Sequence, residues 1–187
     1  ATHAEVLSGE EIKGLVTTSQ EHGEIHHKQA EMLRNLFEFD QSQVGRVMIP
    51  RASIHTLDVN EEPERNLEVI RETEHSRFPV INSAGEESIV GILLAKDIHR
   101  ALLFGQTEPW RDIASLCREP LVVPETQPVD KLFEQMRTSR AHMALVIDEY
   151  GAFVGIVTLE DLLEEIVGEI HDETDEQDEL VDLVAIT

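Results

Sequence analysis

The chain has 187 residues, of which 41% are hydrophobic and only 4% aromatic, so it can form one or two small domains with aliphatic cores. Its formal net charge is −23, because 38 Asp and Glu residues outnumber 15 Lys and Arg residues. A surface of this charge repels nucleic acid and anionic membranes, so we expect no nucleic-acid partner, and we expect any anionic ligand to bind together with a cation.

The single cysteine and the hydropathy of the chain indicate its redox compartment and whether it could span a membrane. Cys117 excludes an internal disulfide and fits a reducing compartment, and we expect it to be a small apolar filler because no base is evident near it. No stretch approaches the roughly 18–20 apolar residues of a membrane span. Because the chain begins with Ala1 rather than Met, we expect a soluble piece of a longer protein.

Residues 10–39 predict two amphipathic helices, because apolar side chains recur at helical spacing in "EEIKGLVTTSQ" and in "HHKQAEMLRNLFEF". His22 and His26 lie one helical turn apart, next to His27, and two histidines in this arrangement can share a transition metal. No third ligand is evident. We therefore interpret the histidines as part of a polar helix face and predict no metal site there.

The middle of the chain contains an internal repeat, whose copies are "GILLAKDI" (91–98) and "GIVTLEDL" (155–162), preceded by "SRFPVIN" and "HMALVID". Ahead of these pairs, residues 63–76 and 128–139 have the apolar spacing of helices. Each copy therefore predicts an extended stretch, a helix, a strand, a glycine-bearing turn, a strand and a helix. We expect the copies to pack together, since neither buries its apolar surface well alone.

Acidic residues dominate the C-terminal end, where eleven of the twenty residues from 160 to 179 are Asp or Glu. Glutamates scattered along one helix rarely converge on one ion, and Mg²⁺ prefers few carboxylates together with water or phosphate oxygens. We therefore predict a solvated face and not a metal site. The stretch "HDETDEQDE" (171–179) has almost no apolar content and is expected to extend into solvent.

Several motifs in fixed order resemble a known family: "VMIPR" (47–51), "SRFPV", "GILLAKDI", "AHMALVIDEYG" and "GIVTLEDLLEEIVGEIHDE". Together they resemble the CBS domain pair (Bateman module) of the CorC/HlyC family, to which the CNNM magnesium transporters are related. The resemblance implies an α/β (α+β) fold of tandem CBS domains packed as a pseudo-twofold pair. The implied boundaries are a helical connector (1–44), CBS domain 1 (45–108), CBS domain 2 (109–171) and an acidic tail (172–187).

The resemblance also implies a function. In that family a membrane domain of the same full-length protein precedes the CBS pair, so we expect the chain to be a regulatory module on the cytoplasmic face of the inner (plasma) membrane. It is expected to form a homodimer through the CBS helices and to control magnesium or cobalt efflux. We expect no enzyme, because the sequence has no nucleophile–base pair, P-loop or HExxH motif.

The step from Gly155 to Asp161 fits the nucleotide motif of such pairs, glycine–hydrophobic–hydrophobic–Thr/Ser–x–x–Asp. Glycine lets the backbone approach a ligand, and a helix start offers free N–H groups to a phosphate or ribose oxygen. Thr158 is expected to donate to the nucleotide, and Asp161 to accept from the ribose hydroxyls. Residue type alone favours a simpler interpretation, in which Thr158 is only an N-cap and Asp161 only a favourable first-turn acid. The family resemblance is what favours the nucleotide contact.

The resemblance places an adenine nucleotide, ATP or AMP accompanied by Mg²⁺, in this site. We expect the adenine against the strand 121–123 and the start of the next strand; the residues named are Val122, Val123, His142, Met143 and Ala144. Arginine suits a phosphate tail by its fork geometry, and the candidates are Arg51 first, then Arg77, with Arg140 also at the edge of a repeat.

The first repeat departs from the motif, because Leu94 stands at the threonine position and only Asp97 is kept. We therefore expect one nucleotide site per chain. The alternative hypothesis is a module that binds no ligand and acts only in dimerisation or protein interaction. The missing threonine and the scarcity of cations give that alternative some support.

Overall fold

The computed structural model describes residues 6–168, and these fall into two compact units. The first unit contains α1 (Gly9–Glu21), α2 (His27–Gln41) and the end of α8 (Leu159–Val167), which confirms the two predicted N-terminal helices. α1 begins at a capping box: the Glu11 amide donates to Ser8 Oγ at 3.3 Å, and the Ser8 amide donates to Glu11 Oε2 at 2.6 Å.

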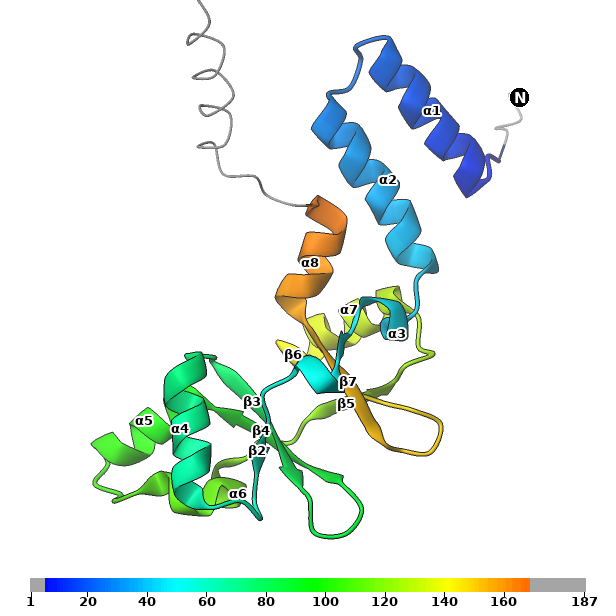
Figure 1. Cartoon of the computed structure of the whole chain (residues 1–187). Helices are drawn as coiled ribbons and strands as arrows, with labels where there is room; N and C mark the ends of the chain where they lie inside the picture. The colour runs from blue at the N-terminus through cyan, green and yellow to red at the C-terminus, as the bar shows by residue number, and fades with distance from the viewer. Residues whose placement is uncertain (1–5, 169–187) are drawn as a thin grey trace, which may run out of the picture. The chain divides into compact units, whose positions relative to one another are not determined.

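The second unit, Gln41–Leu162, contains both repeats and confirms the predicted order of elements (Figure 1). The first repeat forms β2 (Leu57–Asp58), α4 (Pro63–Thr73), β3 (Arg77–Asn82), β4 (Ser88–Leu94) and α5 (Ala95–Leu103). The second repeat forms β5 (Leu121–Pro124), α7 (Val129–Ser139), β6 (Met143–Ile147), β7 (Phe153–Thr158) and α8. Shorter elements precede the first repeat, namely α3 (Val44–Val47), β1 (Ile49–Pro50) and η1 (Arg51–Ser53). Two more, η2 (Pro109–Asp112) and α6 (Ile113–Leu116), lie between the repeats.

The two sheets exchange short segments. One sheet has the order β2-β3-β4 and the other β1-β7-β6-β5, with β2 parallel to β3 and β5 parallel to β6. β1 precedes the strands of the first repeat but pairs antiparallel with β7 of the second, Ile49 opposite Ile156. Reciprocally, Arg118 lies ahead of β5 and forms an antiparallel bridge with Ile92 in β4. Each repeat therefore covers a strand edge of the other, as a pseudo-twofold pair requires.

Two glycines make this exchange possible. A Cβ on Gly155 would lie 2.6 Å from the Ile49 carbonyl oxygen, and a Cβ on Gly91 would lie 2.7 Å from the Arg118 carbonyl oxygen. Both distances are far shorter than a carbon–oxygen contact allows. The space next to the Gly155 Cα is thus occupied by the backbone of β1. From the sequence we expected this glycine to let the backbone approach a ligand.

Apolar side chains fill the space inside and between the repeats. Ile81 and Ile92 of the first repeat pack in one cluster with Met143, Leu145 and Ile156 of the second. β3 and β6 are buried over nearly their whole length, which is why their sequences are almost continuously apolar.

One buried residue of the first repeat is polar. Asn66, on the inner side of α4, accepts from the Asp58 amide at 3.1 Å and donates to the Asp58 carbonyl oxygen at 2.8 Å. The asparagine therefore satisfies the backbone of the short strand β2, which residue periodicity alone does not reveal.

We expect Gly155→Ala to lower the free energy of unfolding by about 1–3 kcal/mol, because the new methyl group displaces β1 from β7. Urea denaturation followed by circular dichroism measures the change. The control is Gly14→Ala in α1, where no heavy atom lies within 4 Å of the added Cβ. There the better helix propensity of alanine should stabilise by about 0.5–1 kcal/mol. Equal stability of wild type and Gly155→Ala would contradict this account of the exchange.

Candidate functional site

The threonine and aspartate of the predicted nucleotide motif bond to each other at the start of α8. Thr158 Oγ1 donates to Asp161 Oδ2 at 2.6 Å, and the Asp161 amide donates back to Thr158 Oγ1 at 3.2 Å. The Thr158 amide also reaches Asp161 Oδ2, at 3.3 Å. The pair is therefore a helix cap. None of these three bonds, all within the described residues, uses Asp161 Oδ1.

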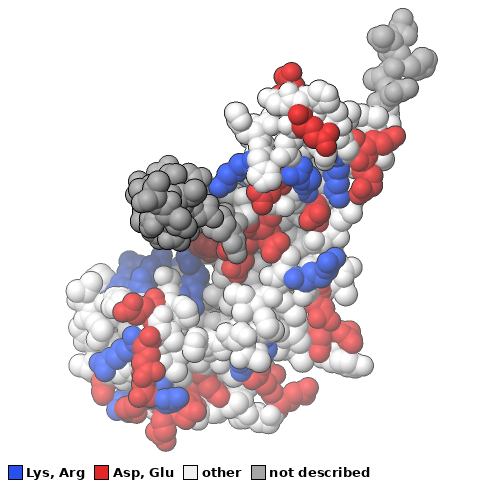
Figure 2. All heavy atoms as spheres, turned by 45° about the horizontal axis from the view of Figure 1, so that its top comes forward, with Lys and Arg blue, Asp and Glu red and all other residues white. Residues whose placement is uncertain are grey.

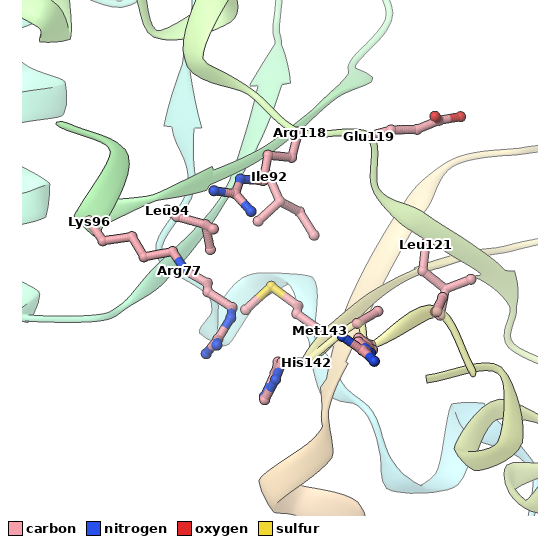
Figure 3. Close-up of a pocket in the computed structure, with 12 residues that line it drawn as sticks. Arg77, Ile92, Leu94, Lys96, Arg118, Glu119, Leu121, His142 and Met143 are labelled. Carbon is pink, nitrogen blue, oxygen red and sulfur yellow. The ribbon is translucent and has the colours of Figure 1, made fainter. Parts of the chain in front are cut away.

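A pocket of about 360 Å³ lies between the two repeats. Its walls come from β3, β4 and the start of α5 in the first repeat, and from the segments before β5 and β6 in the second. The lining residues are Arg77, Ile92, Leu94, Lys96, Arg118, Glu119, Leu121, Ser139, Arg140, Ala141, His142 and Met143. In Figure 3, Arg77 and Lys96 of the first repeat face His142 and Met143 of the second across this space.

The structure brings together only part of the predicted site. Arg77, His142 and Met143 line the pocket, as does Leu121 of the predicted adenine strand. The end of β7 adjoins the same place, because Met143 pairs with Thr158 and the Leu159 amide donates to the His142 carbonyl oxygen at 3.0 Å. Thr158 and Asp161 themselves are not among the lining residues.

The other four predicted contacts, Val122, Val123, Ala144 and Arg51, are not among the residues that line the pocket. Side chains alternate along β5, so Val123 is buried in the core while Val122 is 40% exposed on the opposite face. Ala144, the second residue of β6, is fully buried. Arg51 binds Glu87 through two hydrogen bonds of 3.1 and 3.0 Å, and its guanidinium lies 5.5 Å from the centre of the Phe153 ring.

The lining of the pocket is basic, which is unusual for a chain of this charge. Four of its residues carry Lys or Arg side chains, and Glu119 is the one carboxylate among the residues that line it. Arg118 is paired with Asp97, but within residues 6–168 no ion pair engages Arg77, Lys96 or Arg140. Figure 2 shows how acidic side chains spread over much of the face in view, with basic side chains among them.

Lys96 and Arg118 were not predicted as site residues. Each is a single cation in its local sequence, and only the packing of the first repeat against the second brings them to one pocket. The one available signal was the position of Lys96 two residues after the strand end at Leu94, which matches the position of Glu160 two residues after Thr158.

The histidines and the cysteine have separate surroundings. His22 Nδ1 lies 2.8 Å from the Thr18 carbonyl oxygen, and His27 Nδ1 lies 2.8 Å from Gln20 Nε2. In the part of the chain that the structure describes, no three His, Cys, Asp or Glu side chains form a group able to hold a metal ion. Burial, together with the charge of Asp112, raises the pKa of the Cys117 thiol to about 11.

None of the helices within residues 6–168 combines the length and the apolar character needed to cross a bilayer.

The sequence matches the CBS domain family over residues 44–104 and 110–168. It is 39% identical, over 178 residues, to the magnesium and cobalt efflux protein CorC of Escherichia coli (strain K12); the alignment covers 95% of this chain and 60% of that protein. The chain thus spans about three fifths of that relative's length.

Two solved structures are similar to the chain. The CBS domain of a bacterial CNNM/CorC family Mg²⁺ transporter is 35% identical, with a TM-score of 0.75 over 89% of this chain and 100% of that one. The CBS domain of a bacterial CNNM/CorC family Mg²⁺ transporter in complex with ATP is also 35% identical, with a TM-score of 0.66 over 76% of this chain and 99% of that one.

The raised pKa of Cys117 predicts slow alkylation. At pH 8 we expect iodoacetamide to modify the folded protein about two orders of magnitude more slowly than a thiol of ordinary pKa, because the thiolate fraction falls tenfold per pH unit below the pKa. The rate should rise steadily as the pH approaches about 11. The same chain unfolded in urea is the control, and equal rates for folded and unfolded protein would show that Cys117 is an ordinary exposed thiol.

Proposed function

The chain is a CBS domain pair and belongs to the CNNM/CorC family, and from this premise we propose that it binds an adenine nucleotide together with Mg²⁺ and thereby regulates an ion transporter. The transporter is the longer protein of which such a module forms part. In this proposal its membrane domain moves magnesium or cobalt outward, and the module acts on the cytoplasmic face as a homodimer.

The observation that carries the proposal is the basic pocket between the repeats. Arg77, Lys96 and Arg140 lack carboxylate partners within the described residues, although the chain carries a net charge of −23. Unpaired cations that face one pocket favour a ligand with several negative charges, such as a polyphosphate. Because these cations come from both repeats, the ligand would join the two halves of the module.

The rest of the nucleotide has suitable partners nearby. Leu121 and Met143 offer apolar surface for a purine, and His142 lies beside them. A ribose at the adjoining strand end would donate a hydroxyl to Asp161 Oδ1, the oxygen that the helix cap does not use. The ATP complex of a similar CBS domain supports this class of ligand.

Mg²⁺ is proposed to accompany the nucleotide because it lowers the electrostatic repulsion between the phosphates and the acidic chain. A triphosphate brings negative charge to an already acidic chain, and Mg²⁺ offsets the repulsion between phosphates and carboxylates. A cage of protein ligands is not needed for this effect, because Mg²⁺ is readily held by phosphate oxygens and water.

The second candidate function is a module that binds no nucleotide and acts only by association. It is favoured by the helix cap, in which Thr158 and Asp161 satisfy each other without any ligand. The thermal shifts below separate the two candidates.

We expect ATP with Mg²⁺, at about 100 times its Kd, to raise the melting temperature by about 5–10 °C, because ligand at this excess adds about 2.7 kcal/mol of stability. ADP and AMP, and each nucleotide without Mg²⁺, are measured alongside. Asp161→Ala and Thr158→Val should lose most of the shift, and Thr158→Ser, which keeps the hydroxyl, should retain it. If no nucleotide moves the melting temperature, the association-only function stands.

Arg77→Gln and Arg140→Gln should each weaken binding of Mg–ATP by about 10–100-fold, the effect of one charge-assisted hydrogen bond. The control is Lys131→Gln, an exposed cation of α7 outside the pocket, with less than a twofold change expected. Isothermal titration calorimetry measures the Kd values. Adenosine affinity should be unchanged in both arginine variants, and an equal loss for adenosine would exclude a role in binding phosphate.

A further inference from the structure

The pocket that we assign to the nucleotide, the inner pocket, has a neighbour of about 420 Å³, the outer pocket. The outer pocket belongs wholly to the first repeat, where it lies among the end of α4, the start of β3 and the start of α5. Its lining residues are Glu74, His75, Ser76, Arg77, Leu94, Ala95, Lys96 and His99. Because Arg77, Leu94 and Lys96 line both pockets, the two cavities share one wall.

Backbone pairing builds this shared wall. Arg77 opens β3 and pairs with Leu94, the last residue of β4, so the wall stands at the end of an antiparallel ladder. The Ala95 amide donates to the Ser76 carbonyl oxygen at 3.0 Å, which ties the start of α5 to the segment before β3. Figure 3 shows the side chains of Arg77 and Lys96 at the same side of the inner pocket. Two cations without an ion-pair partner in the described region therefore lie on the boundary between the cavities.

Two exposed histidines, His75 and His99, line the outer pocket. The centre of the His75 ring lies 5.6 Å from that of His55 and 6.0 Å from that of the buried Phe78, so packing limits where this ring can move. His99 follows Lys96 by three residues in α5, and the two side chains therefore share one helix face. Within residues 6–168, neither histidine of the outer pocket takes part in an ion pair.

The charge of the outer pocket depends on these two histidines. Lysine and arginine side chains are ordinarily positive at neutral pH, and Glu74 is the one carboxylate among the described residues that line the pocket. A histidine generally gains its charge as the pH falls from about 8 to about 5. The lining therefore carries two positive charges and one negative charge while His75 and His99 are neutral, and four positive charges and one negative charge when both are protonated.

We propose that the outer pocket is a subsite for the outer phosphate groups of the ligand, and that protonated His75 and His99 strengthen its hold on them. A monophosphate reaches only the inner pocket, whereas a triphosphate passes Arg77 and Lys96 and enters the outer one. The module then responds to the length of the phosphate chain and to pH together. The inference rests on the proposed nucleotide function and adds to it which side chains recognise the outer phosphates.

Isothermal titration calorimetry with Mg–ATP and with AMP, at pH 6.0 and at pH 8.0, tests the proposal. Wild type is compared with His75→Gln/His99→Gln at each pH, so that protonation of the nucleotide and of His142, which lines the inner pocket in both proteins, cancels from the ratio of Kd values. We expect the double variant to bind Mg–ATP about tenfold more weakly at pH 6.0 and within about twofold of wild type at pH 8.0. AMP affinity should be equal in the two proteins at both pH values.

Further variants separate charge from structure. His99→Lys keeps a positive charge at pH 8.0 and should bind Mg–ATP there about threefold more tightly than wild type. His26→Gln changes an exposed histidine of the first unit that lines neither pocket, and it should match wild type. Melting temperatures check folding. Because His75 packs against two rings, His99→Gln alone replaces the double variant if that protein does not fold, with a loss of about threefold expected at pH 6.0.

The proposal is overturned if wild type and the folded variant bind Mg–ATP equally at pH 6.0, if the loss is the same at both pH values, or if AMP shows the same loss. Failure of the proposed function is a different result, in which wild type binds no nucleotide. Inorganic tripolyphosphate with Mg²⁺ then decides on the outer pocket. Binding that strengthens at pH 6.0 and is lost in the variant supports the subsite, and the absence of such binding overturns it.

Discussion

The contact on which the rest of the second unit depends is the approach of one backbone to another at two glycines. Gly155 admits β1, and Gly91 admits the segment around Arg118, so that each repeat completes the sheet of the other. The exchange satisfies backbone groups that a lone sheet edge would leave unpaired, and it holds the two inner sheet faces in one apolar cluster. The pocket follows from it, because its walls come from strands that the exchange brings together.

Electrostatics gives this pocket its chemical character. The acidic residues are spread along the chain, whereas three cations without carboxylate partners in the described region face a single space. A local concentration of positive charge inside a negative field attracts a polyanion to one place and disfavours it elsewhere on the surface. Selectivity of the module would therefore depend less on the number of its cations than on their placement.

Much of the fold could be predicted from the sequence, because helices and strands leave local patterns. The apolar runs of β3 and β6 and the helical spacing of α7 each lie within a dozen residues, and the repeated motif showed that the unit occurs twice. The exchange of segments left no such pattern, since it joins residues far apart in the chain. The sequence indicated that something approaches Gly155 closely, and we expected a ligand there. The structure instead shows the backbone of Ile49, because a sequence does not reveal which segment approaches a glycine.

The site was predictable to a smaller degree. Arg77, His142 and Met143 were named and do line one pocket, while Val122 and Val123 were named together although strand alternation sends them to opposite faces. Arg118 was not predicted as a site residue, because it is held in place by Asp97, which lies twenty-one residues away in the sequence. Whether these residues bind a nucleotide stays a prediction.

The exchange also bears on how such a pair could arise. A single repeat would expose the strand edge beside its glycine, and it would carry a free segment of the kind that covers such an edge. Two separate copies could satisfy each other by trading these segments, in the manner of a domain-swapped dimer. The present chain has the connectivity expected if that dimer were fused end to end, with the segment at Ile49 covering one strand edge and the segment at Arg118 covering the other.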